Sequence, residues 1–372
     1  MKKVLLFARD TGGANAIAPL YSALTKSNYK VEVYGKDFAT RGFKKLGIVC
    51  RDITKSIGPV NEASLKKFLI GKKPFLVITG TNSEEFSEKY FWRVSASLGI
   101  PSIAILDHWT NLGIRFSKYT LRSIGKYKKN KALIFFPTKI FVMDETTSEE
   151  MAKEGIPSNL IEVMGQPYFE FLEKKSLQKV VNQRFGDSKV RLLFASEPLF
   201  DFFKGKAVLD KFLIYNELKI TGLLLEIISK ISISTRKDIE FIIKLHPKDK
   251  RRKYEPIKKQ YLSKNLKIKI VRGSNSWEQI TQSDAVISIS SMLILEAIIL
   301  KKPVICVQIG LRGDSPFLLV KKGLIKPVVN RLELEKELAA ALNGTLGLSK
   351  FDYIRSPIEN IVKYIENQKW QN

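Results

Sequence analysis

The stretch SDAVISISSMLILEAIILKKPVI (residues 283–305) decides the fold of this chain. It opens with an apolar run rich in isoleucine and valine, passes two adjacent serines, continues with a helical pattern, and ends at a proline followed by a second apolar run. A buried strand that leads into a helix and then into another strand is the repeating unit of a parallel sheet with helices on both faces. The stretch therefore predicts a doubly wound α/β domain.

The same alternation of short apolar runs and helical patterns extends over all 372 residues. The runs that predict strands are residues 2–8, 30–35, 75–80, 101–107, 139–144, 190–196, 240–247, 267–273, 284–290 and 303–310. A chain of this length exceeds one ordinary core and fits two domains of roughly 150 to 180 residues each. We expect two Rossmann-like domains, residues 1–168 and 189–350, that face a cleft and are joined by a linker over 169–188. A C-terminal helix is expected over 351–372, with the first domain as its candidate packing partner.

Lysine and arginine dominate the charged residues. There are 63 Lys and Arg against 37 Asp and Glu, a formal net charge of +26, in a chain that is 44% hydrophobic. Such a charge attracts nucleic acid, anionic lipid headgroups or phosphorylated substrates. The sequence contains no nucleic-acid recognition module and no aromatic and glycine pattern of single-strand binding. We therefore expect no nucleic-acid partner, and a non-catalytic nucleic-acid-binding protein is a remote alternative.

The two cysteines, Cys50 and Cys306, lie far apart and lack the spacing of metal ligands. A single pair cannot form the framework of several disulfides that is typical of small secreted domains. The first apolar run is too short for the core of a signal peptide, and no run reaches the roughly 18 apolar residues of a membrane-spanning helix. We expect a cytoplasmic protein with reduced thiols, no essential metal and no other cofactor.

Polar residues collect at the predicted strand ends of the second domain. Ligands of doubly wound sheets bind beyond the carboxyl ends of the strands, where helix N-termini point inward. Ser290 and Ser291 enter a helix whose first turn offers free N–H groups to phosphate oxygens, and Glu296 is placed to accept hydrogen bonds from ribose hydroxyls. The alternatives are N-capping for the serines and a solvated helix face for Glu296. The candidate nucleotide contacts are Ser196, Glu197, His246, Pro247, Ser290, Ser291 and Glu296, with Gln308 as a further loop contact.

The strand ends of the first domain supply candidates for a general base. Asp10, Asp107 and His108 each follow a predicted strand. Asp107 and His108 are adjacent, so in an extended strand they face opposite sides. A turn role for Asp10 and a capping role for Asp107 are equally open. Candidate loop contacts to the ligand are Gly12, Gly13 and Asn15.

Short motifs in both halves resemble one superfamily. The motifs are ARDTGGANAIAPL (residues 8–20), VMGQPYFEFL (163–172), KLHPKD (244–249) and ISS (289–291), followed by KKPVI (301–305). Together they resemble the GT-B glycosyltransferases and the related non-hydrolysing sugar-nucleotide 2-epimerases. KLHPKD with ISS is similar to the His-Pro and serine motifs of bacterial sialyltransferases, Kdo transferases and polyol-phosphate transferases, which use cytidine nucleotides.

This resemblance implies a function. The first domain would be the acceptor side and the second the donor side, with His246, Ser290 and Ser291 on the donor phosphates and Glu296 on the ribose. The implied enzyme is a metal-independent glycosyltransferase of bacterial surface glycan synthesis. It would move a sugar from a nucleotide-activated donor, with CMP or CDP favoured over UDP, to a saccharide or lipid-linked acceptor. The alternative is a 2-epimerase, although those enzymes carry Arg-Pro-Glu where this chain reads Arg-Asp-Thr at residues 9–11.

A basic segment follows Asp107 and His108 in the sequence. Residues 115–136 contain seven Lys and Arg without an acidic residue, interleaved with aromatic and aliphatic side chains. Such a segment can lay an apolar edge on a bilayer while its cations meet anionic headgroups. It predicts peripheral binding at the inner face of the membrane, and an ordinary solvated helix and loop is the alternative. The seven basic residues are Arg115, Lys118, Arg122, Lys126, Lys128, Lys129 and Lys131.

Overall fold

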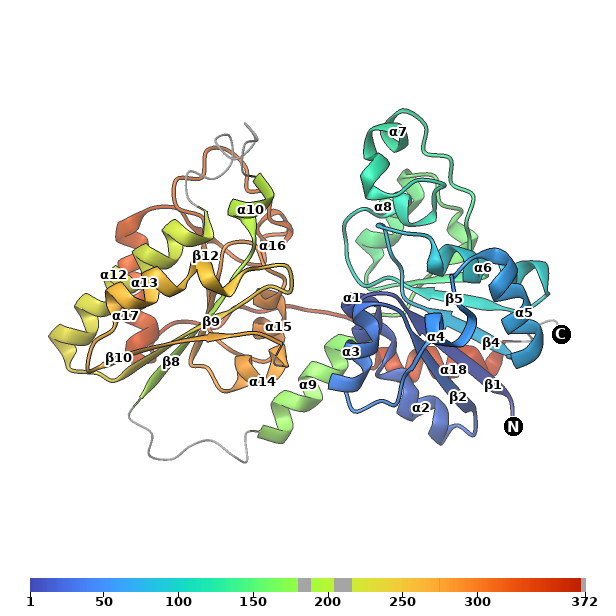
Figure 1. The fold of residues 1–372 in the computed structure, drawn as a ribbon, viewed down its shortest axis with the longest axis horizontal. Coiled ribbons are helices and arrows are strands. Elements are labelled where there is room, and N and C mark those ends of the chain that lie inside the picture. The colour runs from blue at the N-terminus through green and yellow to red at the C-terminus, as the bar shows by residue number, and fades with distance from the viewer. Residues whose placement is uncertain (180–188, 204–215, 274, 369–372) are drawn as a thin grey trace. The chain divides into compact units, whose positions relative to one another are not determined.

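Two parallel sheets organise the chain, one in each of two structural units (Figure 1). The computed structural model describes residues 1–179, 189–203, 216–273 and 275–368. The first unit comprises Met1–Phe171 and Asp352–Asn372, and the second comprises Leu172–Phe351. Helices cover both faces of each sheet, so the predicted doubly wound class is confirmed. In the described ranges, no helix combines the length and apolar character needed to cross a bilayer.

The first unit contains a seven-stranded sheet in the order β3-β2-β1-β4-β5-β6-β7, and every pair in it is parallel. Along the central strand β1, side chains alternate between two cores. Val4 and Leu6 pack against α1, α2 and α18, whereas Leu5 and Phe7 pack against α5 and α6. The strands are β1 (Lys3–Ala8), β2 (Lys30–Gly35), β3 (Arg51–Asp52), β4 (Leu76–Thr79), β5 (Ser102–Ile105), β6 (Lys139–Val142) and β7 (Ile161–Val163).

Most helices of the first unit connect successive strands, whereas α9 continues into the second unit and α18 is the last helix of the chain. The helices are α1 (Thr11–Ile17), α2 (Leu20–Lys26), α3 (Phe38–Lys45), α4 (Ile53–Ile57), α5 (Glu62–Lys72), α6 (Ser87–Ser97), α7 (Ile124–Lys129), α8 (Glu145–Lys153), α9 (Pro167–Lys179) and α18 (Pro357–Asn367), with 3-10 turns η1 (Gly113–Phe116), η2 (Leu121–Ser123) and η3 (Ser158–Leu160). The C-terminal helix α18 buries Ile361 and Ile365 in the core of this unit. Its Tyr364 ring lies edge-on to Phe141, with 5.1 Å between the ring centroids.

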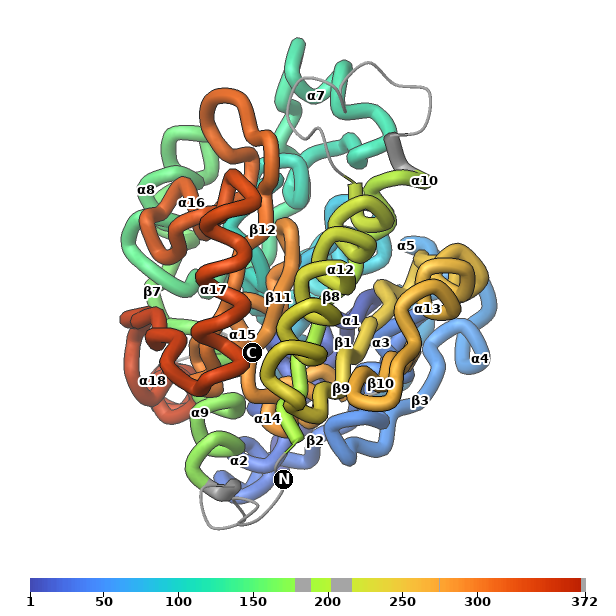
Figure 2. Tube along the Cα trace, turned by 90° about the vertical axis from the view of Figure 1, so that its left-hand side faces the viewer, coloured from blue at the N-terminus to red at the C-terminus, as the bar shows by residue number. Residues whose placement is uncertain are grey.

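The second unit contains a six-stranded sheet in the order β10-β9-β8-β11-β12-β13, also parallel. Helices α12 and α17 lie side by side on one face, joined by an ion pair of 2.8 Å between Arg331 and Glu226 (Figure 2). The strands are β8 (Val190–Ala195), β9 (Ile239–Lys244), β10 (Leu266–Val271), β11 (Ala285–Ser288), β12 (Val304–Val307) and β13 (Pro327–Val328). The helices are α10 (Leu199–Phe203), α12 (Glu217–Thr235), α13 (Glu255–Tyr261), α14 (Ser276–Thr281), α15 (Leu293–Ile299), α16 (Leu318–Lys321) and α17 (Arg331–Asn343), with the 3-10 turn η5 (Arg251–Lys253).

The expected linker over 169–188 differs from the structure in its first part. Residues 169–179 belong to α9, because Pro167 suits the first turn of a helix and Phe169 and Leu172 are buried. Residues 180–188 of the expected linker lie outside the described residues. The boundary between the compact units falls within α9, at Phe171 and Leu172.

Candidate active site

Two carboxylates meet at the carboxyl edge of the first sheet. Neighbouring strands β1, β4 and β5 lead into loops that carry Asp10, Asn82 and Asp107. Asp10 Oδ1 accepts a hydrogen bond of 2.8 Å from Gly13 N at the start of α1, and its Oδ2 accepts one from Asn82 Nδ2. A Cβ atom on Gly12 would overlap Asp107 Oδ2 and would lie 3.5 Å from Asp10 Oδ1. The two carboxylates therefore flank Gly12.

Asp107 forms an ion pair with a cation, whereas the hydrogen-bond donors to Asp10 are neutral groups. Asp107 Oδ1 accepts from Arg115 Nη1 at 2.7 Å, and the same nitrogen donates to Thr81 Oγ1 at 2.7 Å. Burial and the negative charge of Asp107 raise the pKa of Asp10, against the lowering effect of its hydrogen bonds and of Arg115. A higher pKa makes a carboxylate a better proton acceptor. Asp10 is thus the stronger candidate base, with Asp107 held in an ion pair beside it.

His108 does not fit the role of base that the sequence suggested. Its Nδ1 accepts from Thr110 N at 3.2 Å and lies 2.9 Å from Thr110 Oγ1. An amide that donates to Nδ1 leaves the proton of a neutral imidazole on Nε2. Burial lowers the pKa of His108, although Asp107 opposes this effect. A neutral His108 in this geometry offers a hydrogen-bond donor at Nε2 rather than a lone pair.

The glycine loop of the first unit packs tightly. Gly13 is buried, and Asn15 is half-buried within α1. A Cβ atom on Gly80, at the end of β4, would lie 2.6 Å from Gly13 Cα. Gly12 and Gly13 therefore leave room for the close packing around the two carboxylates. Their predicted contact with a ligand is a separate role.

Replacing Gly80 with alanine is expected to lower the free energy of unfolding by about 1 to 3 kcal/mol, because backbone atoms must move to admit the methyl group. Gly125 is the matched control, since it lies in α7 with open space where its Cβ would stand. Gly125→Ala is expected to leave stability unchanged or to raise it by about 1 kcal/mol or less. Urea unfolding of the two variants measures the difference, and equal stabilities would contradict the close packing.

Glu197 binds the serine loop at the carboxyl edge of the second sheet. Its Oε1 accepts from Ser290 N at 2.7 Å and lies 3.0 Å from Ser288 Oγ, and its Oε2 accepts from Ser290 Oγ. Burial raises the pKa of Glu197, against these hydrogen bonds. The Ser290 amide and hydroxyl that the sequence assigned to a phosphate are thus engaged by a side chain of the protein. Glu197 itself, predicted as a nucleotide contact, has both carboxylate oxygens in this loop.

The helix after the serines begins later than expected. Helix α15 starts at Leu293, and Ser291 Oγ accepts from Leu293 N at 3.3 Å, as in the capping alternative. Glu296 accordingly lies in the first turn of α15, where it is half-buried. Gln308 is buried, and its Nε2 donates to Ile289 O at 3.1 Å. It therefore holds the backbone next to Ser290 in place.

His246 lies at the end of β9 in the same arrangement as His108. Its Nδ1 accepts from Lys248 N at 3.2 Å, which leaves Nε2–H as the donor of the neutral ring. Burial and the charge of Lys248 lower its pKa, against the effect of Asp249. The ring is half-buried and Pro247 after it is exposed. His246 therefore offers a neutral N–H donor at a strand end, which suits an anionic oxygen.

Ser196, a predicted nucleotide contact, has partners inside the protein. Its hydroxyl is buried and bonds to the Asp249 carboxylate and the Tyr254 hydroxyl. Its single proton can be donated to only one acceptor at a time, and the Asp249 carboxylate is a charged acceptor within reach. Contact of Ser196 with a nucleotide stays a prediction.

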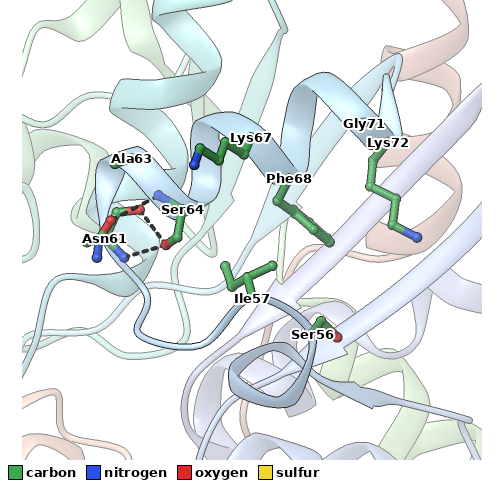
Figure 3. Close-up of a pocket in the computed structure, with 9 residues that line it drawn as sticks. All are labelled: Ser56, Ile57, Asn61, Ala63, Ser64, Lys67, Phe68, Gly71 and Lys72. Carbon is green, nitrogen blue, oxygen red and sulfur yellow. Dashed lines mark hydrogen bonds between the residues drawn. The ribbon is translucent and has the colours of Figure 1, made fainter.

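One cavity lies away from both strand-end clusters. It measures about 690 Å³ and is lined by parts of α4 and α5, including Ser56, Phe68 and Lys72 (Figure 3). Asn61 and Ser64 on its wall bond to each other in a capping box, and Lys72 pairs with Glu32 at 3.0 Å. Because these polar groups are engaged within the protein, the cavity is not a candidate active site. Among the described residues, no group of three or more His, Cys, Asp or Glu is placed to hold a metal ion.

Comparisons with known proteins cover the second unit by sequence and both units by structure. Residues 219–310 match the family model described as capsule polysaccharide biosynthesis protein. The structure of UDP-GlcNAc 2-epimerase from Neisseria meningitidis bound to UDP-GlcNAc is 18% identical, with 98% of this chain and 100% of that chain covered and a TM-score of 0.62. A putative UDP-N-acetylglucosamine 2-epimerase from Listeria monocytogenes is 15% identical over 100% and 99% of the two chains, with a TM-score of 0.66. MurG from Acinetobacter baumannii is 11% identical over 99% and 100%, with a TM-score of 0.51. No curated protein sequence matches the chain.

These similarities extend over both parallel sheets. The chain has the GT-B fold. The expected resemblance to GT-B glycosyltransferases and 2-epimerases is thereby confirmed at the level of fold. The family match lies within the second unit of this chain.

Within the GT-B fold, the structure adds four residues to the two clusters. They are Thr81, Asn82, Arg115 and Asp249. Asn82 and Thr81 follow β4 directly, so the rule that ligands gather at strand ends pointed to them. Arg115 gave no such signal, because it lies in a 3-10 turn within a segment that looked like a solvated basic surface.

Proposed function

We propose that the protein is a metal-independent glycosyltransferase that moves a sugar from a nucleotide-activated donor to a saccharide or lipid-linked acceptor in bacterial surface glycan synthesis. The observation that carries this proposal is the match of residues 219–310 to capsule polysaccharide biosynthesis proteins. That range includes the strand ends with His246, Ser290 and Glu296. The cytoplasm, where nucleotide-activated sugars are made, is the proposed location.

The proposed chemistry assigns different work to the two units. In an inverting transfer, Asp10 accepts the proton of the acceptor hydroxyl as that oxygen bonds to the anomeric carbon of the donor sugar. The bond between the anomeric carbon and the donor phosphate breaks, and the phosphate leaves with the electron pair. The Nε2–H of His246 and the hydroxyl of Ser291 are proposed to stabilise its charge. Glu296 is proposed to accept hydrogen bonds from the ribose.

A thermal-shift screen tests the donor site. A ligand that binds only the folded protein raises the unfolding midpoint. The compounds to compare are CMP, CDP, UDP, GDP and their sugars, and the motif resemblance favours a cytidine nucleotide. If none of them shifts the midpoint at millimolar concentration, the proposed donor site is wrong.

His246→Ala and Glu296→Ala are each expected to weaken donor binding about tenfold, because each removes a hydrogen bond to a charged or sugar group. Isothermal titration with the nucleotide found in the screen measures the affinity. Asp10→Asn, in the first unit, is the control and is expected to leave donor affinity unchanged. Loss of affinity in Asp10→Asn with retention in the other two variants would reverse the roles of the units.

A sugar-nucleotide 2-epimerase is the second candidate, favoured by neighbours of that name that match at least 98% of the chain. Against it, Asp10 and Thr11 stand where those enzymes carry Pro and Glu. The two activities yield different products from a nucleotide sugar. A transferase releases free nucleotide only when an acceptor is present, whereas an epimerase converts the sugar without one. Product analysis by NMR with and without an acceptor glycan separates them.

The proposal also includes membrane binding by the basic segment, but by fewer of its residues than the sequence predicted. Arg115 is buried in its ion pair with Asp107, and Phe116 and Tyr127 belong to the protein interior. The exposed apolar side chains are Ile124 and Ile134. The exposed cations on and around α7 are Lys118, Arg122, Lys126, Lys128, Lys129 and Lys131, of which Lys131 donates to the Glu154 carbonyl at 3.0 Å. This smaller patch is proposed to bind the anionic inner face of the membrane, where a lipid-linked acceptor resides.

Changing Lys126, Lys128 and Lys129 together to Glu is expected to abolish flotation with phosphatidylglycerol vesicles. Each cation near an anionic surface contributes about 1 kcal/mol, so reversing three lowers the partition more than 100-fold. The parent is expected to bind anionic but not neutral vesicles, less strongly as salt rises.

A charge-matched control separates the patch from the net charge of +26. The control reverses three exposed lysines of the second unit, namely Lys259, Lys264 and Lys267. It is expected to float as the parent does. Equal flotation of the α7 variant and the parent would remove this segment from the proposal.

A further inference from the structure

Three neighbouring strands bring the proposed donor contacts to one edge. In the second sheet, β8 lies between β9 and β11. The loop after β9 carries His246, the loop after β11 carries Ser290, and the dipeptide Ser196 and Glu197 follows β8 between them. Adjacent residues of an extended chain point to opposite sides. The dipeptide is therefore placed to reach both outer loops.

Ser196 connects the dipeptide to the His246 loop. Its hydroxyl bonds to Asp249 Oδ2, which also accepts from Tyr254 OH at 2.9 Å. Asp249 N donates to His246 O at 2.9 Å, and its Oδ1 accepts from Lys250 N at 2.9 Å. Asp249 thus closes the turn that presents the imidazole and fastens that turn to the end of β8.

Asp249 is kept charged in a buried setting. Its side chain is fully buried, and Lys253 Nζ lies 2.6 Å from its Oδ1. Lys253 also bonds to the Glu217 carboxylate, so one ammonium group serves two buried acids. Burial raises the pKa of Asp249, but the hydrogen bonds from Lys253, Ser196 and Tyr254 lower it further, and the net direction is down. The anion is a fixed element of the fold.

Glu197 connects the dipeptide to the serine loop on the other side. Its carboxylate accepts from both the amide and the hydroxyl of Ser290. Hydrogen bonds join Asp249 to Ser196 and Glu197 to Ser290, and the peptide bond between Ser196 and Glu197 connects the two sets. The His246 loop and the Ser290 loop follow strands that are not neighbours, because β8 lies between β9 and β11, and these contacts join the two loops across the end of β8.

We propose that Ser196, Glu197 and Asp249 are positioning residues, a joint that holds the two outer loops in one donor-binding arrangement before the donor arrives. The inference rests on the proposed donor role of this edge. It gives the dipeptide a function other than contact with the nucleotide. It also predicts that damage to the joint acts on donor affinity through His246.

Two hydroxyl deletions test the joint against a merely structural role. Ser196→Ala and Tyr254→Phe each remove one buried hydroxyl from the same Asp249 oxygen, but only Ser196 directly follows β8. Both variants are expected to unfold at a lower midpoint. In isothermal titration with CMP, and with UDP as a second probe, Ser196→Ala is expected to bind at least fivefold more weakly than the parent. Tyr254→Phe is expected to stay within twofold of the parent, and equal affinities of the two variants would overturn the proposal.

A double-mutant cycle shows whether the effect passes through the imidazole. If Ser196 acts by positioning His246, the variant with both Ser196→Ala and His246→Ala binds within twofold of His246→Ala alone. Additive losses would overturn the proposal. If the parent binds neither nucleotide, the donor role fails, and hydrogen exchange still decides on the joint. Faster exchange of the Asp249 amide in Ser196→Ala but not in Tyr254→Phe supports it, and equal exchange overturns it.

Discussion

Replacing Asp10 with asparagine is expected to lower turnover roughly 100-fold or more while leaving donor affinity unchanged. An amide cannot accept the proton of an acceptor hydroxyl, but its Oδ1 can still accept from Gly13 N and hold the start of α1. The measurement is kcat for nucleotide release at saturating donor and acceptor, together with donor affinity by titration. Asp37→Asn is the control, because Asp37 is a half-exposed partner of Arg9 and is expected to leave kcat unchanged.

The pH profile separates Asp10 from Asp107 as the base. A rate that needs ionised Asp10 falls as the pH drops through the pKa of that carboxyl. Burial and the negative charge of Asp107 raise this pKa, so Asp107→Asn removes the second cause and lowers it. The acid limb of activity in Asp107→Asn is therefore expected to move to lower pH while activity is retained in part. Inactive Asp107→Asn beside active Asp10→Asn would assign the base to Asp107 instead.

The strands were predictable because they are buried on both faces. Strands β1, β4, β5, β9 and β11 consist mostly of apolar residues, as buried parallel strands do, and their ends marked where Asp10, Asp107, His246 and Ser290 lie. Strands β3, β7 and β13 span two or three residues, too few for any periodic pattern. Apolar runs in the sequence thus predict the central strands of each sheet and the edge at which the candidate site residues lie.

The partners of those strand-end residues were not predictable, because they come from distant parts of the chain. Glu197 and Ser290 are 93 positions apart, and Ser196 and Asp249 are 53 apart. Asp249 stood in the sequence only as the last residue of the KLHPKD motif, with no partner assigned, whereas in the structure it is buried with Ser196 and Lys253 bound to its carboxylate. A single sequence gives residue types at strand ends, and only the fold decides whether they face a ligand or one another.

Replacing Lys89 with methionine is expected to lower the free energy of unfolding by about 3 kcal/mol or more. Lys89 is buried on α6, and its Nζ donates to the carbonyl oxygens of Ile114, Ser117 and Tyr119 at 3.0, 2.8 and 2.7 Å. Each of the three carbonyls loses a buried hydrogen bond, at a cost of about 1 to 3 kcal/mol. Turnover is expected to fall as well, because the same loop holds Arg115 against Asp107.

The control for this prediction is Lys118→Met, which removes an exposed lysine from the same loop. It is expected to change stability by about 0.5 kcal/mol or less. Urea unfolding is followed by tryptophan fluorescence in a Trp277→Phe background, which removes the tryptophan of the second unit and leaves the signal of the first. A shift no larger in Lys89→Met than in Lys118→Met would mean that water replaces the ammonium group and that the loop keeps its shape without it. Arg115 would then hold its place beside Asp107 through Thr81 and the Thr110 carbonyl, and the ion pair would persist in Lys89→Met with unchanged turnover.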